Sequence, residues 1–155
     1  MPHINELFDY VVSIFIVRRD RVLLVHHKRY DEWLPIGGHI ELDEDPEQAL
    51  RREVREECGL RVRLLNPTPD IAHRDVKPLP TPSYMDVHRI SRTHGHIAFV
   101  YFAVSTSGEV RLHEREHREY RWVPASELGS PDLRLTRSIR FYCRKALEAA
   151  RRARR

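Results

Sequence analysis

The sequence predicts a single domain of the α/β (or α+β) class, in which a mixed sheet carries helices on both faces. Several β-rich runs alternate along the chain with two amphipathic helical segments, which favours helices packed against a sheet. The 155 residues match the size of one domain, because domains commonly contain about 100–150 residues. Hydrophobic residues make up 41% of the chain, so residues 1–155 contain enough apolar material for one core.

The N-terminal part of the chain has the pattern of a β-hairpin. Residues 8–17 and 21–27 are rich in β-branched and aliphatic side chains, and a short polar segment separates them. A loop through residues 30–33 is expected to lead from this hairpin to Gly37 and Gly38. Glycines at this place allow the backbone to approach a ligand closely.

The next segment carries the start and stop signals of a helix. Asp45 is expected as the N-cap, with Pro46 at the first helical position and Gln48 three residues after the cap. Gly59 is expected to end the helix, because a left-handed residue is favoured at this position. A strand is predicted to follow at residues 61–65.

The second half of the chain predicts further strands and a final helix. Residues 66–83 are rich in proline and are expected to form an ordered surface excursion. Strands are predicted at residues 86–90, 97–104 and 121–123, with a turn at residues 105–108. The sequence Ser-Pro-Asp at residues 130–132 is expected to open a last helix over about residues 132–152, whose apolar side chains follow one stripe.

The first predicted helix places three carboxylates along one edge. At about 100° per residue, Glu53, Glu56 and Glu57 fall within about 100° of arc. Like charges at these spacings repel each other by about 0.2–0.5 kcal/mol per pair. A bound cation offsets this cost, and oxygen ligands favour a hard ion such as Mg²⁺. The alternative is a solvated face on which the glutamates pair with neighbouring arginines.

A spaced motif covers the glycine pair and this helix. The segment GHIELDEDPEQALRREVREECGL, from Gly38 to Leu60, fits the pattern G-x5-E-x7-R-E-U-x-E-E-x-G-U, where U is a bulky aliphatic residue. The nine fixed positions are filled by Gly38, Glu44, Arg52, Glu53, Val54, Glu56, Glu57, Gly59 and Leu60. The pattern is the Nudix box, and the chain therefore resembles the Nudix hydrolase (MutT-like) family, with no departure inside the motif.

The resemblance implies an α/β/α sandwich with a divalent metal site. Glutamates that match Glu53, Glu56 and Glu57 ligate the metal in this family, and a carbonyl of the glycine pair, Gly37 or Gly38, contributes a further oxygen. The expected ion is Mg²⁺, for which Mn²⁺ can substitute. The sequence itself leaves the number of ions open.

The resemblance also implies a reaction and roles for individual residues. Water is expected to attack a phosphorus atom of a nucleoside di- or triphosphate derivative, a nucleoside diphosphate linked to a further group. The expected catalytic residues are Glu53, Glu56 and Arg52. Either glutamate is a candidate general base, whereas Arg52 is expected to orient the carboxylates by pairing with Glu44.

Some members of the family supply another acidic residue from a segment that resembles residues 114–119. Glu116 and Glu119 are the two candidates in this chain. The alternative is that both belong to a charged surface loop, and the sequence does not separate these interpretations.

Three basic side chains are candidate substrate contacts. Lys28 and Arg29 precede the glycine pair and are placed to contact phosphate, although solvated loop charges are the alternative. His96 lies on a strand that is expected to line the cleft. His94 and His96 are expected to share a strand face, but two ligands without a third nearby in sequence do not predict a transition-metal site.

Two other functions are alternatives to hydrolysis. An isomerase of the same fold that acts on isopentenyl diphosphate needs a catalytic cysteine, and neither Cys58 nor Cys143 is suitably placed. A non-catalytic nucleotide sensor usually lacks box glutamates, whereas this chain contains all of them. The leading hypothesis is therefore a Nudix pyrophosphohydrolase.

The composition of the chain indicates which kinds of partner the protein binds. The net charge of +4 favours anionic ligands such as a nucleotide-like diphosphate. Arginines at the C-terminus indicate a solvated end of the chain rather than a nucleic-acid site. No apolar run reaches the roughly 20 residues that a membrane span needs, and two isolated cysteines favour a cytoplasmic setting. A homodimer is common in the family and is a further expectation.

Overall fold

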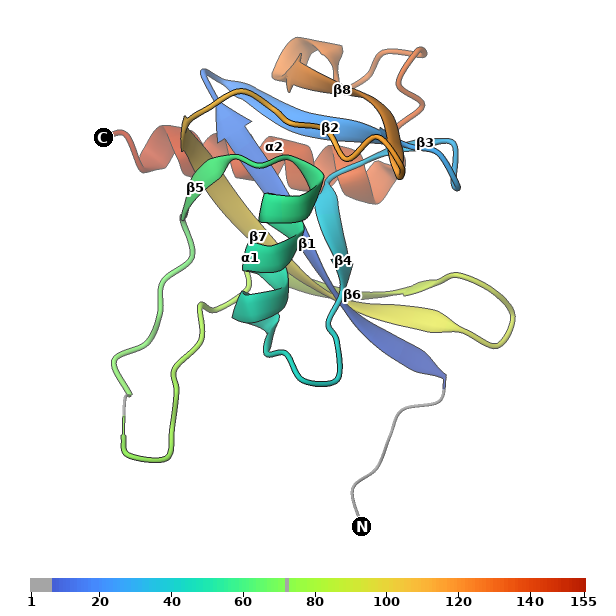
Figure 1. Cartoon of the computed structure of the whole chain (residues 1–155). Coiled ribbons are helices and arrows are strands. Elements are labelled where there is room, and N and C mark those ends of the chain that lie inside the picture. Colours follow the sequence, from blue (N-terminus) through green and yellow to red (C-terminus); the bar gives the residue numbers. More distant parts are fainter. Residues whose placement is uncertain (1–6, 72) are drawn as a thin grey trace.

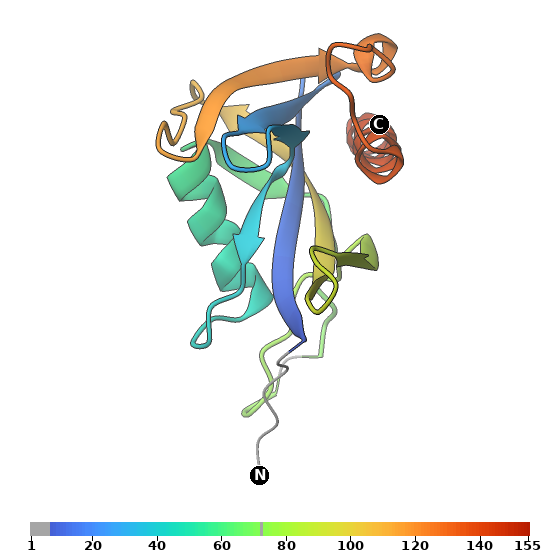
Figure 2. The same ribbon diagram turned by 90° about the vertical axis from the view of Figure 1, so that its right-hand side faces the viewer.

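The computed structural model describes residues 7–71 and 73–155. Within these residues, eight strands form one mixed sheet, and a helix lies on each face of it. Figures 1 and 2 show α1 (Pro46–Glu57) on one side of the sheet and α2 (Arg137–Arg152) on the other. The predicted α/β/α sandwich with a mixed sheet is confirmed.

The sheet is organised around a central pair of long parallel strands. β1 (Phe8–Arg18) and β7 (Gly95–Ser107) run parallel, with Phe8 opposite Gly95 and Val17 opposite Val104. β1 is also antiparallel to β2 (Arg21–His27) and β4 (Ile36–His39), which confirms the predicted hairpin of β1 and β2. The remaining strands pair antiparallel at the edges and are β3 (Glu32–Leu34), β5 (Arg61–Leu64), β6 (Tyr84–Arg89) and β8 (His117–Pro124).

Alternating side chains of β1 separate the core into two layers. Phe15 packs with Phe102 and Leu147 between the sheet and α2. Ile14 packs with Leu50 and Tyr101 between the sheet and α1. This division follows from the pleat, since successive residues of a strand point to opposite faces. Both helices are thus anchored to the same two central strands.

The predicted ends of α1 are confirmed. The carboxylate of Asp45 accepts hydrogen bonds from the backbone N–H groups of Glu47 and Gln48, and the Gln48 side chain accepts one from the Asp45 N–H. Such a cap stabilises a helix by about 1 kcal/mol. Gly59 follows the helix with φ of 62°, which is the left-handed conformation expected there. The caps fix where α1 begins and ends, and buried Ala49, Leu50 and Val54 fix which side of it faces the sheet.

Three boundaries differ from the sequence prediction. Short strand β3 takes up part of the loop that was expected through residues 30–33, and β4 forms at the glycine pair that follows, since each is held by pairing with a longer strand. β7 continues through the expected turn as far as Ser107, where it still pairs with Arg61. β8 begins at His117, so it is longer than predicted.

The last helix begins five residues later than the predicted start at residue 132. Its N-cap is Thr136, whose hydroxyl accepts a hydrogen bond from the Ile139 N–H. The preceding segment buries Leu133 and Leu135, while Arg134 between them has φ of 46°. Burial of alternate leucines in an irregular segment therefore outweighs the Ser-Pro-Asp helix signal.

The proline-rich residues 66–83 form an excursion outside the sheet, and Ala72 within them lies outside the described residues. The described part contains no helix or strand beyond an isolated bridge between His73 and Val76. Both ends are fixed through Asn66, whose amide nitrogen donates to the Thr81 carbonyl and whose amide oxygen accepts from the Phe102 N–H. The excursion is thus tied to the sheet at its base.

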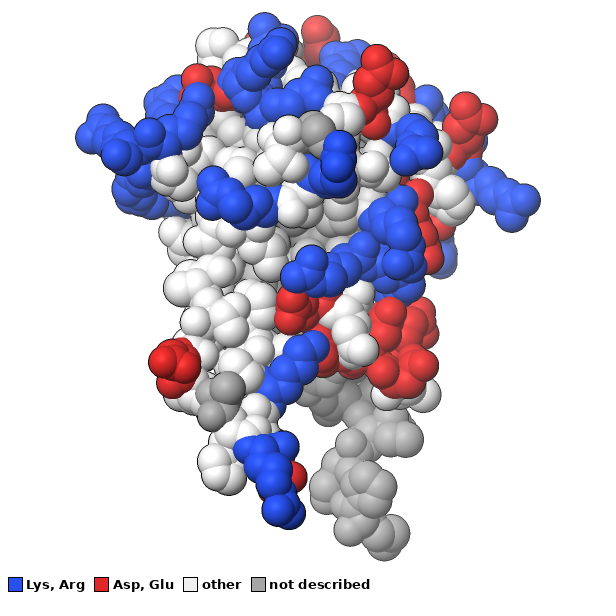
Figure 3. Space-filling model, turned by 60° about the vertical axis from the view of Figure 1, so that its left-hand side comes forward, with Lys and Arg blue, Asp and Glu red and all other residues white. Residues whose placement is uncertain are grey.

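The C-terminal arginines are exposed, as expected for a solvated end of the chain, but two of them pair with Asp20 in the turn between β1 and β2. Figure 3 shows Lys and Arg side chains gathered over the upper part of the face in view. Arg154 and Arg151 contact the Asp20 carboxylate at 2.6 and 3.3 Å, and their hydrogen bonds lower the pKa of Asp20. In the described residues, no helix has the length and apolarity that crossing a bilayer requires.

Candidate active site

A cavity of about 820 Å³ connects the acidic edge of α1 with the face of the sheet that carries α2. At one end lie Glu53, Glu56 and Glu57. The floor and the far wall are formed by residues of β1, β4, β6, β7 and α2, including Ser13, Gly37, Gly38, His39, Asp86, His88, His96, Ala98 and Tyr142. The volume is of the size that small-molecule sites commonly have.

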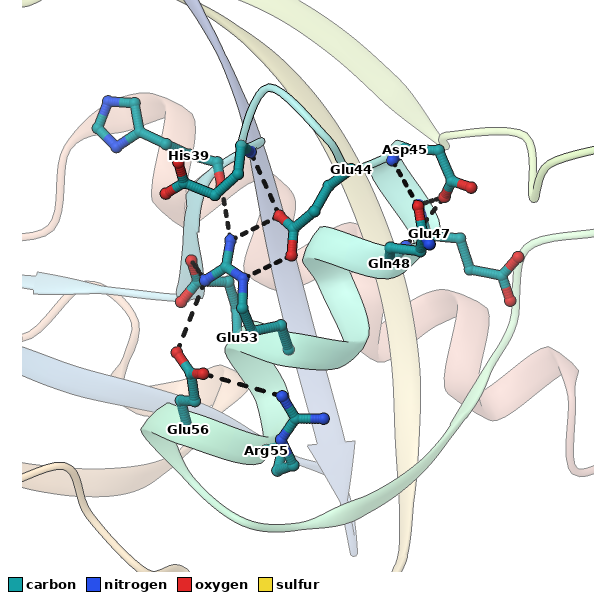
Figure 4. A network of polar contacts seen from close by, with 10 residues as sticks. His39, Glu44, Asp45, Glu47, Gln48, Glu53, Arg55 and Glu56 are labelled. Atoms are coloured by element: carbon teal, nitrogen blue, oxygen red, sulfur yellow. Dashed lines mark hydrogen bonds and ion pairs between the residues drawn. The ribbon is translucent and has the colours of Figure 1, made fainter.

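Arg52 links three carboxylates at the acidic end. Its guanidinium binds Glu44 in a bidentate manner, with Nε–Oε1 and Nη2–Oε2 distances of 2.7 and 2.9 Å. Nη1 donates to Glu53 Oε1 at 2.6 Å and lies 3.6 Å from Glu56 Oε2. Nη2 also donates to the His39 carbonyl at 2.9 Å, which ties β4 to α1. Figure 4 shows these carboxylates and His39 around the guanidinium. The Glu44–Arg52 pair is therefore present as expected.

Glu53 lies in a space that only a glycine leaves open. The side chain is almost fully buried, and a Cβ atom added to Gly38 would lie 2.2 Å from Glu53 Oε1. Burial, followed by the negative charges of Glu57 and Glu56, raises the pKa of Glu53 to about 7, although Arg52 opposes the shift. A carboxylate held in this environment gains strongly from a nearby cation.

Glu57 is buried against a histidine that the sequence analysis did not identify. Its Oε2 accepts a hydrogen bond from the Gly37 N–H at 3.1 Å, and its Oε1 lies 3.3 Å from Nε2 of His117. His117 is only 2% exposed, and neither ring nitrogen makes an aligned hydrogen bond within the described residues. The imidazole is thus a buried polar group directed at the acidic end of the cavity.

Of the two candidate additional acids, the structure brings Glu116 to the cavity. Ligand atoms of Glu57, Glu116 and His117 lie within 4.8 Å of one another, a spacing that suits a metal ion. Glu119 is exposed, lies outside the cavity lining, and has Oε1 3.7 Å from Nη2 of Arg121. Glu116 lies in the segment just before β8, next to His117, whereas Glu119 lies within β8, beyond an irregularity in the pairing of this strand with β2.

The acidic end fits a divalent cation by its donor chemistry. Glu53, Glu56, Glu57 and Glu116 present carboxylate oxygens on the cavity lining. Arg52 neutralises only part of this charge, because its closest contacts are to Glu44 and Glu53. Hard cations prefer oxygen ligands of this kind, and Gly38 also lines this cavity.

Only one of the three candidate substrate contacts reaches the cavity. His96 lines the cavity. The Lys28 ammonium instead donates to the Glu114 carbonyl, and the guanidinium carbon of Arg29 lies 5.7 Å from the ring centroid of Tyr30. Neither Lys28 nor Arg29 belongs to the cavity lining. Pairing of β2 with β8 directs this loop towards the segment before β8.

The far wall contains a polar chain that sequence reasoning missed. Asp86 Oδ2 accepts from the Tyr142 hydroxyl at 2.6 Å, and Asp86 Oδ1 lies 2.8 Å from Nδ1 of His88. This chain joins β6 to α2 beside the cavity. Asp86 and Tyr142 are 56 residues apart in the sequence, so no local pattern predicts their contact.

Both thiols are inaccessible. Cys58 and Cys143 have no exposed surface, and burial raises their pKa values to about 11 and about 12. A thiol of this kind is not ionised near neutral pH and cannot reach the cavity. The isomerase alternative, which needs a catalytic cysteine, is therefore not supported.

Comparison with known proteins identifies the family. The family model of the NUDIX domain matches residues 7–144, and the chain belongs to the NUDIX family. Nucleoside triphosphatase NudI of Escherichia coli (strain SE11) is 34% identical over 102 residues, which are 66% of this chain and 68% of that protein. The chain is thus an enzyme of the Nudix pyrophosphohydrolase class, rather than a non-catalytic sensor.

Solved structures support the same assignment. A hydrolase of the NUDIX family from Clostridium perfringens is similar with a TM-score of 0.80 and 36% identity, covering 92% of this chain and 97% of that one. A MutT NUDIX hydrolase from Burkholderia pseudomallei has a TM-score of 0.65 and 28% identity, covering 93% and 98%.

Proposed function

We propose that this enzyme hydrolyses a phosphoanhydride bond of a nucleoside triphosphate, or of another nucleoside diphosphate derivative, with Mg²⁺ as cofactor and Mn²⁺ as a substitute. The observation that carries the proposal is the burial of Glu53 and Glu57 at the edge of a cavity, with Arg52 bound to Glu44 behind them. Buried carboxylates are costly to the fold unless a cation joins them.

In the proposed site, Glu53, Glu56, Glu57 and the Gly38 carbonyl hold the ion, and Glu116 is an additional acidic ligand. When bound, Mg²⁺ supplies electrostatic stabilisation of the phosphate oxygens and of the charge that develops on them. The bidentate Arg52–Glu44 pair keeps the side chain of Glu53 in place. Arg52 is accordingly a positioning residue in this proposal.

Glu56 is the general base in this proposal, and Glu53 is the alternative. The Glu56 side chain is half exposed and lines the cavity, so it can accept a proton from a water molecule beside the substrate. Glu53 is engaged by Arg52 at 2.6 Å and lacks this freedom. Glu56 is therefore preferred to Glu53, because its carboxylate is more accessible from the cavity.

The proposed substrate places its phosphates at the acidic end and its nucleoside towards the far wall. His96 and the Asp86–Tyr142 chain offer polar groups at that wall, between apolar side chains such as Ala98 and Val100. The similarity to a protein named nucleoside triphosphatase makes nucleoside triphosphates the first substrates to test.

The test is a hydrolysis screen with Mg²⁺ or with EDTA over nucleoside triphosphates, nucleotide sugars, ADP-ribose and dinucleoside polyphosphates. Hydrolysis of at least one class with Mg²⁺, abolished by EDTA, is expected, and oxygen-18 water identifies the phosphorus atom that is attacked. Hydrolysis that persists in EDTA, or no hydrolysis of any compound with Mg²⁺, contradicts the proposal.

Two features of the protein in the cell remain predictions. The free and buried state of Cys58 and Cys143 agrees with a reducing cytoplasm, which we propose as its location. A homodimer is testable by light scattering of the purified chain, where a mass of one chain contradicts it.

A further inference from the structure

A second group of titratable side chains gathers around the start of β1. Strand register brings it together, because Asp9 of β1 lies opposite His96 of β7, which lies opposite His88 of β6. His39 of β4 lies opposite Val11, two residues along β1 from Asp9. Residues opposite each other, or two apart on one strand, share a face of the sheet. Imidazoles from three separate strands therefore lie close to the first residues of β1.

The Asp9 carboxylate is the centre of this group. Its Oδ2 lies 3.0 Å from His94 Nε2 and 3.3 Å from His39 Nε2. Ligand atoms of Asp9, His94 and His96 all lie within 4.8 Å of one another. Donors in a tetrahedral zinc site are separated by about 3.3 Å, because the bonds to zinc are about 2.0–2.1 Å long. The three residues are thus close to the spacing of a metal site before any ion binds.

The imidazole of His96 is crowded by three other imidazoles. The ring of His96 lies 5.0 Å from that of His39, 5.3 Å from that of His88 and 5.5 Å from that of His94, measured between centroids. Burial, followed by the charges that these neighbours would carry, lowers the pKa of His96 to about 4. A neutral imidazole offers a lone pair to a metal.

The backbone that carries these ligands is held by its own hydrogen bonds. The His94 carbonyl accepts from the N–H groups of Ile90 and Ser91 at 2.9 and 3.0 Å, which closes the connection between β6 and β7. The Gly95 N–H donates to the Leu7 carbonyl at 3.0 Å and joins this connection to the start of β1 (Figure 1). The donor atoms are therefore partly preorganised, which lowers the entropic cost of binding.

We propose that Asp9, His94 and His96 bind a divalent transition metal ion of the zinc class, with the fourth position open to water or to His39. Two imidazoles and one carboxylate suit such an ion, whereas Mg²⁺ prefers oxygen ligands alone. None of the three ligands belongs to the acidic edge of α1, and His96 lines the far wall of the cavity, so the ion lies at the opposite end of the cavity from the proposed Mg²⁺ site and beside the proposed nucleoside position. A bound ion fastens the start of β1 to the β6–β7 hairpin.

The test is calorimetric titration of the whole chain with Zn²⁺ while Mg²⁺ is kept saturating. One equivalent of Zn²⁺ is expected to bind, and His94→Ala and His96→Ala are each expected to weaken it by at least about a hundredfold, since even outer partners of a ligand cost about 10–100-fold. His73→Ala removes an exposed histidine outside the group and is expected to leave binding unchanged. No binding of Zn²⁺, or binding unaffected by both ligand variants, overturns the proposal.

A second measurement separates this site from the acidic end, where Glu57, Glu116 and His117 are also close together. Visible d–d absorption of bound Co²⁺ is expected in the wild type and in Glu57→Gln, and is expected to be lost in Asp9→Asn. Loss in Glu57→Gln with retention in Asp9→Asn assigns the ion to the acidic end and overturns the proposal. Thermal unfolding of each variant shows whether it is folded, and metal binding is read independently of hydrolysis.

Discussion

Oε1 of Glu57 lies 3.3 Å from Nε2 of His117, and both side chains are buried at the acidic end of the cavity. The contact joins the last turn of α1 to the first residue of β8. It places an imidazole directly behind a carboxylate proposed to hold a metal. The start of β8 therefore belongs to the lining of the proposed active site.

Removing this imidazole is expected to weaken the metal site. His117→Ala leaves Glu57 without its partner, and the apparent affinity for Mg²⁺ in the hydrolysis assay is expected to fall by about 10–100-fold. His117→Gln retains a polar group and is expected to recover part of the loss. A variant whose Mg²⁺ dependence equals that of the wild type contradicts the role, whatever its melting temperature.

Glu56→Gln tests the general base. The substitution keeps the shape of the side chain but removes its basicity, so kcat is expected to fall by at least about a hundredfold. The melting temperature should change little, because this side chain is half exposed. Glu119→Gln, outside the cavity, is the matched control and is expected to keep its turnover. Near-normal turnover of Glu56→Gln transfers the role to Glu53.

Gly38→Ala tests the close approach of the β4 backbone to Glu53. The added Cβ would lie 2.2 Å from Oε1, so the carboxylate must move. A displacement of about 1 Å in an active site can cost about a hundredfold in rate, and a loss of kcat/KM of this order is expected. Gly129→Ala is the control, since no heavy atom lies within 4 Å of the added Cβ and its φ is not in the left-handed region. Equal activity of the two variants rejects the steric argument.

The Glu44–Arg52 pair predicts a dependence of stability on pH. The Arg52 hydrogen bonds hold the pKa of Glu44 below its ordinary value of 4.5. The folded state then binds fewer protons than the unfolded state, so this contribution is present above pH 4.5 and is lost as pH falls through the lowered pKa. Glu44→Gln is expected to lower the melting temperature at neutral pH and to flatten its decline in acid. Parallel melting curves of the two proteins across this range contradict the prediction.

Helix α1 was predictable because the residues that define it are close together in the sequence. The caps at Asp45 and Gly59 and the position of three glutamates on one edge depend only on helical periodicity and on neighbouring residues. The Arg52–Glu44 pair came from the family resemblance, because the segment between these two residues, which are eight positions apart, includes the turn into the helix. Strands β1 and β2 were also recognisable, since each is long and apolar.

The amino-acid sequence by itself determined the class of fold, the acidic edge of α1 and the family. Tertiary structure alone decided that Glu116 rather than Glu119 reaches the cavity, that His117 lies behind Glu57, and that α2 begins at Arg137. It also brought Asp9 into contact with His94, although these residues are 85 positions apart in the sequence (94 − 9). The physical reason is that strand register and the burial of distant side chains depend on the whole core, whereas helical periodicity and capping depend on a few adjacent residues.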